Sequence, residues 1–541
     1  YVKETGRWKV SVNNGYSQSN RQVFGYPDAN LDGTDLLQYA LNLKEPTVYD
    51  PPAHGEKRGP KNIQKTKQAS EKIKDLKKSF REWVLNDNEA ADTIFKTYNE
   101  KFNGVRLREY DEPDFDYYPG ATTELQLRPH QKRAVSRILQ GSTLLAHSVG
   151  TGKTFIMATA AMEMKRLGMA NKPTIVALNS TLEQVGREFK QLYPAANIMI
   201  PNRKQRDAKN RQRTMAKIAT GNWDAVIIPQ SFLDMLPNDP KREEEYLQKE
   251  FAELGQAKIA ASQRDGRNSP TVKDLVRAEN ALEKKIDKLK DAKIKDRGMT
   301  FEETGIDALF VDEAHKYKKL PLQTQMGNVK GIDQSATKKG LAMLMKVQWV
   351  QENNDGKNVV MATGTPISNT VAEAWNFMRY ISPKLLKDYD MENFDSFASL
   401  FGDTISDTEM TASGDFKIVE RFAKFTNGPE LIAAFRTIAD VITQEEVPDL
   451  NLPPLKGGEP TNIIIPQTDG VSEEIADIRL ELEKFEKMSG QEKRENSHIP
   501  LVSFTRAKKA AIDIRLIHPF AADEPDSKVK RAIGKVLEIY H

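Results

Sequence analysis

The sequence predicts an α/β fold, in which a parallel β-sheet is flanked by helices. Short apolar runs recur along the middle of the chain, and helix-like segments separate several of them. Runs that are apolar throughout, rather than alternating, are typical of parallel sheets that are covered on both faces. The runs expected to form strands are residues 143–146, 172–179, 224–228 and 308–311. Two of these runs lead into residues that carry specific chemistry.

The first of these strands leads into a glycine loop and then into a helix. Gly150 and Gly152 follow the run at 143–146, and Thr154–Met162 has the composition of a helix. Glycines let backbone N–H groups close around phosphate oxygens, and a helix N-terminus adds a partial positive charge. We therefore expect a phosphate-binding loop made of Gly150, Thr151, Gly152, Lys153 and Thr154.

Two residues of this loop have separate expected roles. The Lys153 ammonium would reach the β- and γ-phosphates of a nucleoside triphosphate, and the Thr154 hydroxyl would ligate Mg²⁺. The general pattern has a glycine five residues before the second loop glycine, whereas His147 stands there in this chain. The alternative interpretation is a glycine-rich turn between a strand and a helix that binds no ligand.

A pair of carboxylates follows the strand expected at 308–311. Open α/β sheets bind ligands at the carboxyl ends of their strands, where Asp312 and Glu313 stand. Asp312 is expected to hold Mg²⁺ through water, and Glu313 to orient or deprotonate the attacking water. His315 would couple this pair to neighbouring motifs. An Asp-Glu pair can also simply cap a helix, but with the loop upstream it predicts binding and hydrolysis of a nucleoside triphosphate.

Further motifs fall in a specific order along residues 120–390. Leu127-Arg128-Pro129-His130-Gln131 precedes the loop, and Thr363-Gly364-Thr365-Pro366-Ile367-Ser368-Asn369 follows the carboxylates. This series resembles the first lobe of superfamily 2 helicase-like ATPases of the Swi/Snf type. The resemblance implies a RecA-like sheet that binds ATP with Mg²⁺.

The same resemblance implies roles for single residues and partners. Gln131 would read adenine with Arg128 nearby. Thr363, Gly364 and Thr365 would couple hydrolysis to movement on double-stranded DNA. The family also has a second RecA-like lobe, whose motifs are not found here. Val185 replaces a usual Trp and Lys319 a frequent Asn, and neither position carries the expected chemistry.

Three segments point to a narrower resemblance within this family. The segments Leu144–Thr154, Leu309–His315 and Ala362–Asn369 are similar to those of very large proteins of phages and conjugative elements. In such proteins a Swi/Snf-like ATPase is often joined to an adenine-specific DNA methyltransferase. The resemblance therefore implies a DNA methyltransferase, fused or associated, as a partner.

Composition limits the class of protein without indicating its partners. The 541 residues carry a net charge of only +3, so any DNA-binding surface must be local. Cysteine is absent, which excludes disulfides and cysteine-based zinc sites. No run approaches the roughly 18 apolar residues of a membrane span, and the start at Tyr1 shows neither Met nor a signal peptide. We expect a piece of a longer, cytoplasmic protein of a bacterial or phage-infected cell, with no membrane partner.

Four segments are expected along the chain. The ATPase lobe spans 121–390, after a loop-rich and helical region at 1–120. Within the lobe, an insertion at about 238–300 has two periodic, charged segments that predict antiparallel helices. A mainly helical protrusion at 391–526 leads to 527–541, which resembles the start of the second lobe. In the N-terminal region, a stripe is expected to pack in a core: Ile73, Leu76, Phe80 and Trp83.

The densest cluster of positive charge follows the second strand. Its possible contacts to DNA phosphates are Arg203, Lys204, Arg206, Arg211 and Arg213. The simpler interpretation is a solvated helix face. For the whole chain, two other functions remain open: a non-catalytic DNA-binding or scaffolding module with a structural nucleotide site, or the motor subunit of a restriction or defence system.

Overall fold

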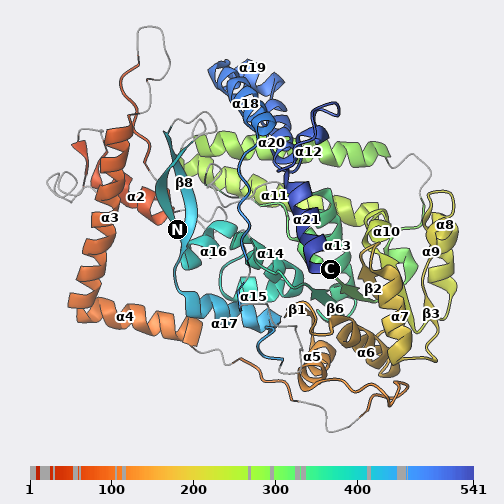
Figure 1. Ribbon diagram of the computed structural model, residues 1–541. Helices are drawn as coiled ribbons and strands as arrows, with labels where there is room; N and C mark the ends of the chain where they lie inside the picture. The colour runs from red at the N-terminus through yellow and green to blue at the C-terminus, as the bar shows by residue number, and fades with distance from the viewer. Residues whose placement is uncertain are drawn as a thin grey trace. The chain divides into compact units, whose positions relative to one another are not determined.

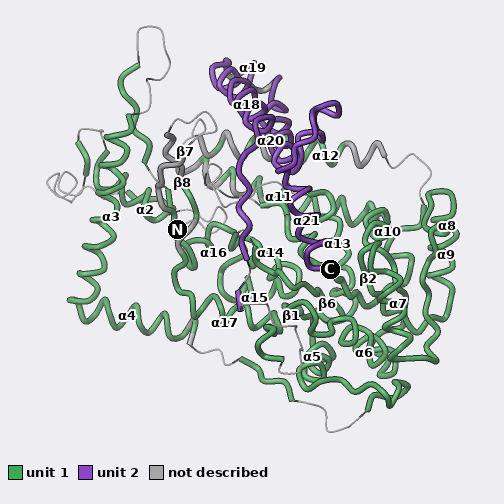
Figure 2. The backbone as a smooth tube through the Cα atoms, in the orientation of Figure 1, with its two compact units in different colours: residues 1–405, 420–450 green, residues 406–419, 451–541 purple. Residues whose placement is uncertain are grey.

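The structure is a computed structural model in which the chain divides into two compact units (Figure 2). One unit comprises residues 1–405 and 420–450, and the other comprises residues 406–419 and 451–541. The described residues are 8–11, 25–27, 31–44, 46–52, 59, 62–103, 107–111, 117–265, 270–292, 298–322, 324, 329, 337–368, 370–410, 416–447, 458–459 and 461–540. The two units are described separately below.

The first unit is built on a seven-stranded sheet in which every pairing is parallel. The order across the sheet is β3-β4-β2-β5-β6-β1-β9, so β1 lies between β6 and β9. Figure 1 labels β1, β2, β3 and β6 of this sheet. The strands are β1 (Thr143–His147), β2 (Pro173–Ala177), β3 (Ile198–Met199), β4 (Ala225–Pro229), β5 (Ala308–Val311), β6 (Val359–Ala362) and β9 (Ala439–Ile442). The predicted fold class, an α/β protein with a RecA-like parallel sheet and flanking helices, is confirmed.

Each face of the sheet is buried under its own set of helices. Successive strand residues point to opposite faces, so Leu144 joins one core and Leu145 the other. The core of Leu145 includes side chains of α5 (Pro129–Gln140), α6 (Lys153–Arg166) and α7 (Leu182–Leu192). The core of Leu144 includes side chains of α10 (Gln230–Asp234), α13 (Lys338–Glu352), α14 (Ala372–Ile381), α15 (Pro383–Asp388), α16 (Phe394–Phe401) and α17 (Gly428–Ile438). Burial on both faces explains why the strands read as continuous apolar runs.

The sheet continues beyond residue 390, where the sequence analysis ends the ATPase lobe. After α16, the strands β7 (Gly402–Met410) and β8 (Phe416–Phe425) form a separate two-stranded sheet. The chain then passes through α17 and adds β9 beside β1. With four residues and a central Asp440, β9 is too short and too polar to stand out as a strand in the sequence.

The expected helical insertion consists of α11 (Pro240–Asp265) and α12 (Pro270–Ala292). Leu247 and Leu254 of α11 share a small core with Leu282 and Ile286 of α12, and Lys258 pairs with Glu279. The residue numbers run in opposite directions through these contacts, so the helices are antiparallel, as their periodicity predicts. This core is separate from the two that cover the sheet.

The N-terminal helices correct one prediction. Here α2 (Gly33–Leu41) packs on α3 (Ile63–Asn86), which is followed by α4 (Asn88–Tyr98) and a π-helical turn at Asn99–Asn103. Of the predicted core stripe, Ile73 is buried and Leu76 is partly buried against α2. Phe80 and Trp83 are 57% and 52% exposed, so the prediction is wrong for these two. The reason is that α3 continues past the part that α2 covers (Figure 1).

The second unit contains α18 (Asp469–Lys487), α19 (Gly490–Glu495), α20 (Ile499–Ala510) and α21 (Lys528–Tyr540). Arg506 of α20 pairs with Glu474 and Glu481 of α18, which fixes these two helices together. Across the described residues of both units, no helix is long and apolar enough to cross a bilayer.

Candidate functional site

The predicted phosphate loop connects β1 to α6. Its backbone turns sharply, with φ values of 89° at Gly150 and 84° at Gly152, a left-handed conformation that glycine adopts without strain. Gly152 is the N-cap of α6 and has no side chain that could cap the N–H groups of the first turn. A helix terminus with uncapped donors is suited to an anion.

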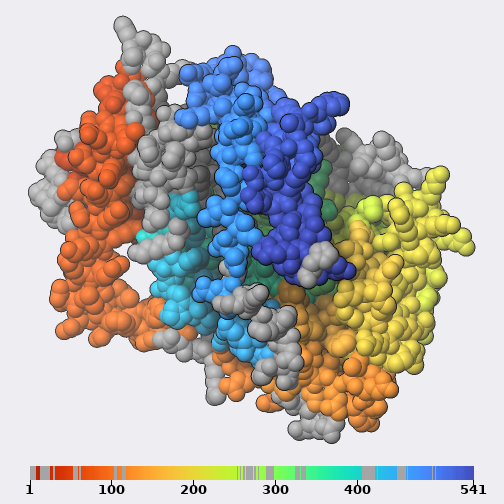
Figure 3. All heavy atoms as spheres, in the orientation of Figure 1, coloured from red at the N-terminus to blue at the C-terminus, as the bar shows by residue number. Residues whose placement is uncertain are grey.

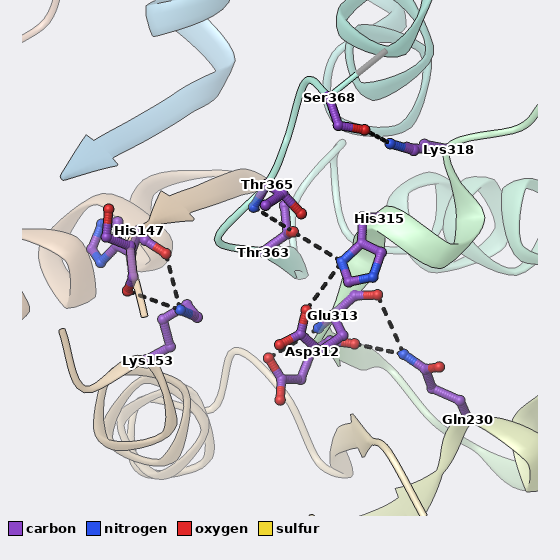
Figure 4. A network of polar contacts seen from close by, with 11 residues as sticks. His147, Lys153, Gln230, Asp312, Glu313, His315, Lys318, Thr363, Thr365 and Ser368 are labelled. Atoms are coloured by element: carbon purple, nitrogen blue, oxygen red, sulfur yellow. Dashed lines mark hydrogen bonds and ion pairs between the residues drawn. The ribbon is translucent and has the colours of Figure 1, made fainter. Parts of the chain in front are cut away.

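The Lys153 side chain folds back into this loop (Figure 4). Its Nζ donates to the carbonyl oxygen of His147 at 2.9 Å and to that of Ser148 at 3.1 Å. Burial lowers the pKa of Lys153, while the negative charges of Asp312 and Glu313 oppose this shift. The ammonium is therefore held at the loop by groups that an anion of higher charge density can replace.

The Gln131 amide supports the loop from α5. Its Nε2 donates to the carbonyl oxygen of Thr151 at 3.1 Å, and its Oε1 accepts from the backbone N–H of Arg128 at 2.8 Å. His130 Nε2 lies 3.0 Å from the same Thr151 oxygen. The motif around Arg128 and Gln131 is thus joined to the loop, and here the Gln131 amide bonds to backbone at both ends.

Replacing Gly152 with Ala should disrupt the loop. A Cβ there would lie 2.1 Å from Gln131 Nε2, in addition to the strain of the left-handed φ. Gly168→Ala is the matched control, because Gly168 has a φ of 70° but no atom within 4 Å of an added Cβ. We expect Gly168→Ala to cost about 1–2 kcal/mol in chemical unfolding. Gly152→Ala should cost more, and equal losses would contradict the packing described here.

The two carboxylates follow β5, two strands from β1 across the sheet. Asp312 Oδ1 accepts from the Glu313 backbone N–H at 2.9 Å. Burial, reinforced by the neighbouring charge of Glu313, raises the pKa of Asp312 to about 6. Glu313 has a φ of 50°, which is unusual for a residue with a side chain and typical of functional turns. Gln230 Nε2 donates to the carbonyl oxygen of Asp312 at 2.7 Å and supports this turn.

Three of the predicted coupling residues lie together beside Glu313 (Figure 4). His315 Nδ1 is 3.0 Å from Glu313 Oε2 and 3.2 Å from Thr363 Oγ1. The Thr363 hydroxyl also accepts from the backbone N–H of Thr365 at 3.1 Å. The imidazole of His315 therefore joins the carboxylate after β5 to the threonine that follows β6.

The strand β6 lies between β5 and β1, so the segment after it also meets the phosphate loop. A Cβ on Gly364 would lie 3.6 Å from the carbonyl oxygen of His147, which places this backbone against the loop. Further along, Ser368 accepts from Lys318, which also pairs with Glu373 at 2.8 Å. Asn369, the last residue of this motif, lies outside the described residues.

Three residues at the site escape the sequence analysis. Gln230 directly follows β4, so its place at the carboxyl end of a predicted strand is a usable signal. His130 stands inside a motif but has no role assigned to it. Asp440 contacts His147 from β9, and no sequence pattern indicates it.

The donor set is consistent with a nucleotide and Mg²⁺. The Lys153 ammonium lies at the loop, where it donates to the carbonyl oxygens of His147 and Ser148. Thr154, the second residue of α6, offers a hydroxyl oxygen, and Asp312 offers a carboxylate oxygen. Within the described residues, no three His, Asp or Glu side chains gather as a metal cluster. The Thr154 and Asp312 oxygens suit Mg²⁺, which keeps several waters and is bound mainly by phosphates and one or two protein ligands.

The five predicted DNA contacts lie on two short helices at the β3 edge of the sheet (Figures 1 and 3). Arg203, Lys204 and Arg206 are on α8 (Arg203–Arg206), while Arg211 and Arg213 are on α9 (Arg211–Thr220). Thr214 Oγ1 donates to the carbonyl oxygen of Gln205 and joins the two helices. Arg203, Lys204 and Arg213 are exposed, and in the described part of the chain no carboxylate lies within ion-pair distance of the five.

The basic helices also contact the end of the sheet where the phosphate loop lies, which is formed by the carboxyl ends of the strands. Arg206 donates to Asn179 Oδ1 at 3.1 Å, and Asn179 follows the carboxyl end of β2. A parallel sheet with a glycine loop after β1 and an Asp-Glu pair after β5 is an arrangement typical of nucleotide-binding α/β proteins.

The chain belongs to a known family of this class. Residues 138–443, more than half of the chain, match the model of the family described as "Probable helicase domain". This match confirms the helicase-like resemblance that the motifs indicate, and it extends through β9. Residues 1–104 match a domain of unknown function, DUF8437.

Individual relatives are more distant. The chain is 27% identical over 156 residues to "Defense against restriction protein B" of Escherichia phage P1, which is 28% of this chain and only 7% of that protein. The Sulfolobus solfataricus SWI2/SNF2 ATPase core in complex with dsDNA is 15% identical, with a TM-score of 0.32 over 80% of this chain and 66% of that one. The SWI2/SNF2 ATPase core domain of the same organism is 14% identical, with a TM-score of 0.30 over 81% of this chain and 68% of that one. Scores this low say nothing about function.

Proposed function

We propose that this chain is the ATP-binding and ATP-hydrolysing motor lobe of a DNA-dependent translocase. One observation carries the proposal: Lys153 after β1, Glu313 after β5 and Thr363 after β6 lie at one edge of the sheet, with His315 joining the last two. A phosphate-binding ammonium and a water-activating carboxylate are the two groups that phosphoryl transfer to water requires.

The residues of the loop would bind the triphosphate first. Lys153 exchanges the carbonyl oxygens of His147 and Ser148 for phosphate oxygens, and the N–H groups at the start of α6 donate to the same anion. Thr154 would ligate Mg²⁺ with its hydroxyl, and Asp312 would hold the ion through water. When bound, Mg²⁺ supplies positive charge that stabilises the charge developing on the transferred group.

Glu313 would then act on the attacking water. Its carboxylate accepts a proton or a hydrogen bond from the water, and His315 holds the carboxylate through Nδ1 at 3.0 Å. Since His315 also contacts Thr363, a change at the phosphates can be transmitted to the segment of Gly364 and Thr365. We propose that this segment couples hydrolysis to movement on DNA.

The proposed partners extend beyond this chain. Double-stranded DNA is proposed because the basic helices α8 and α9 lie at the same edge as the nucleotide site, and because the resemblance to Swi/Snf-type ATPases implies it. A second RecA-like lobe would close over the nucleotide and add cationic groups, worth roughly 10³–10⁵ in rate. A phage or mobile-element origin, and a linked DNA methyltransferase, are further proposals from the narrower resemblance.

A second candidate function is a motor that acts in restriction or defence. The observation that favours it is the similarity to the phage P1 protein named "Defense against restriction protein B", although the chain covers only 7% of that protein. The chemistry proposed for the nucleotide site is the same in both cases. A non-catalytic scaffold differs, since it would retain nucleotide without turnover.

The test is phosphate release from ATP by wild type, with and without duplex DNA, alone and with the second lobe supplied. We expect slow release alone, and a clear increase with the second lobe and DNA together. Nucleotide binding without any turnover under all conditions would favour the scaffold. Failure of the wild type to bind nucleotide at all would overturn the proposal.

Neutralising the basic cluster should weaken DNA binding. The variant carries glutamine at Arg203, Lys204, Arg206, Arg211 and Arg213. If these side chains bind phosphates, the slope of log affinity against log salt should fall by about 0.9 for each phosphate that is no longer neutralised. The control has the same change in net charge, with glutamine at exposed positions of α3: Lys67, Lys72, Lys74, Lys78 and Arg81. Equal slopes for the two variants and wild type would show that the cluster is a solvated helix face that does not contact phosphates.

A further inference from the structure

The last residue of β1, His147, and the next two, Ser148 and Val149, lead into the phosphate loop. They are bonded to β9 and to the residues that follow it. The Ser148 backbone N–H donates to the carbonyl oxygen of Ile442 at 2.9 Å, and Gln444 Nε2 donates to that of Val149 at 3.3 Å. Just before these two contacts in the chain, His147 Nε2 lies 2.7 Å from Asp440 Oδ2. Three consecutive loop residues are therefore held by one short strand and its extension.

The His147–Asp440 contact is the only one of these that joins two side chains. The His147 ring is fully buried, whereas the Asp440 side chain is 24% exposed. Nδ1 of His147 has no hydrogen-bond partner in the described part of the structure. The ring is thus held by a single polar contact, the one to Asp440, and its position depends on that carboxylate.

Asp440 is itself held as an anion. Burial alone would raise the pKa of Asp440, but the hydrogen bond and charge of His147, with the charges of Arg137 and Arg133, outweigh burial and lower it. Arg137 also donates to the carbonyl oxygens of Arg436 and Thr437 at 3.0 and 2.9 Å, which fixes the chain just before β9. The carboxylate therefore stands at a defined place beside the loop.

We propose that Asp440 is a positioning residue for the phosphate loop and acts through His147. The proposal rests on the proposed nucleotide site. His147 connects the two, because its ring binds Asp440 while its carbonyl oxygen accepts from Lys153 Nζ at 2.9 Å. The carboxylate thereby fixes the peptide on which the phosphate-binding lysine rests.

This role accounts for the departure from the general loop pattern at residue 147. A glycine there would leave the peptide free to turn, and the loop would lose more conformational entropy when phosphate binds. A histidine anchored by a carboxylate orders the same peptide before phosphate arrives. The loop is then held from both sides, by Gln131 and His130 at Thr151 and by Asp440 at His147.

The first experiment measures the affinity of the complete chain for Mg²⁺-ADP by calorimetry. Asp440→Ala removes the anchor, and we expect about tenfold weaker binding, the size of one hydrogen bond to a charged group. Asp440→Asn keeps an acceptor for Nε2–H and should recover most of the affinity. Thr437→Ala is the control, because its hydroxyl donates only within α17, to Ala433.

The second experiment asks whether Asp440 acts through His147. His147→Phe fills the buried space without the polar contact, and adding Asp440→Ala to it should change the affinity no further. Additive losses would overturn the proposal, as would wild-type affinity in Asp440→Ala. If a thermal melt shows that Asp440→Ala does not fold, the affinities of Asp440→Asn and His147→Phe test the proposal instead. Wild-type affinity in His147→Phe would contradict it. Wild type that binds no Mg²⁺-ADP is a failure of the proposed function instead.

Discussion

Lys153→Ala should weaken ATP binding by about 100-fold or more, because it removes charge-assisted hydrogen bonds to two phosphates. The structure supports an effect on the ligand rather than on folding. Among the described residues, the Lys153 ammonium donates only to two backbone carbonyl groups, those of His147 and Ser148. Its pKa is lowered by burial, so removing the charge also removes a cost that the folded chain carries.

The measurement is ATP affinity by calorimetry, with thermal unfolding as a check on the fold. Lys165→Ala is the matched control, since Lys165 is on the same helix and donates to the backbone carbonyl of Asn171, far from the loop. We expect wild-type affinity for the control and an unchanged melting temperature for both variants. Tight ATP binding by Lys153→Ala would remove the phosphate loop from the proposed site.

Glu313→Gln should retain ATP and lose hydrolysis by about 10²–10⁴-fold, the usual contribution of a general base. The amide preserves the shape and the left-handed backbone at φ 50°, but cannot take a proton from water. Its oxygen can still accept from His315, so the link to Thr363 is kept. Binding and turnover are therefore expected to separate in this variant.

Single-turnover phosphate release and ATP affinity, measured on the same preparation, test this separation. Glu183→Gln on the exposed face of α7 has the same change in charge and should behave as wild type. Turnover at the wild-type rate in Glu313→Gln would show that another group activates water. Asp312 would be the next candidate, since it is the neighbouring carboxylate at the same turn.

The sequence predicts the centre of this molecule well, because the centre follows simple local rules. Strands buried on both faces are continuous apolar runs, and the glycine loop and the Asp-Glu pair stand directly after two of them. The positions of β1, β2, β4 and β5 follow from these runs to within a few residues. The order of the motifs also indicates that their residues meet at one edge, as His315 and Thr363 do.

The parts that escape prediction depend on contacts between distant segments. Asp440 lies in a strand of four residues, and nothing near it in the chain indicates that it meets His147. Phe80 and Trp83 continue the apolar stripe of Ile73, yet they lie beyond the reach of α2. Periodicity reports which side of a helix is apolar and not how far its partner extends.

The place of β9 has a consequence for synthesis of the chain on the ribosome. His147 and Asp440 are 293 positions apart, so β1 leaves the ribosome long before β9 can pair with residues Leu144–His147. At translation rates of about 5–20 residues per second, that interval is roughly 15–60 seconds. For this time the strand that carries the phosphate loop has unpaired N–H and C=O groups, which can pair with another nascent chain. Yield of soluble protein should therefore respond to chaperone supply more strongly than the size of the sheet alone suggests.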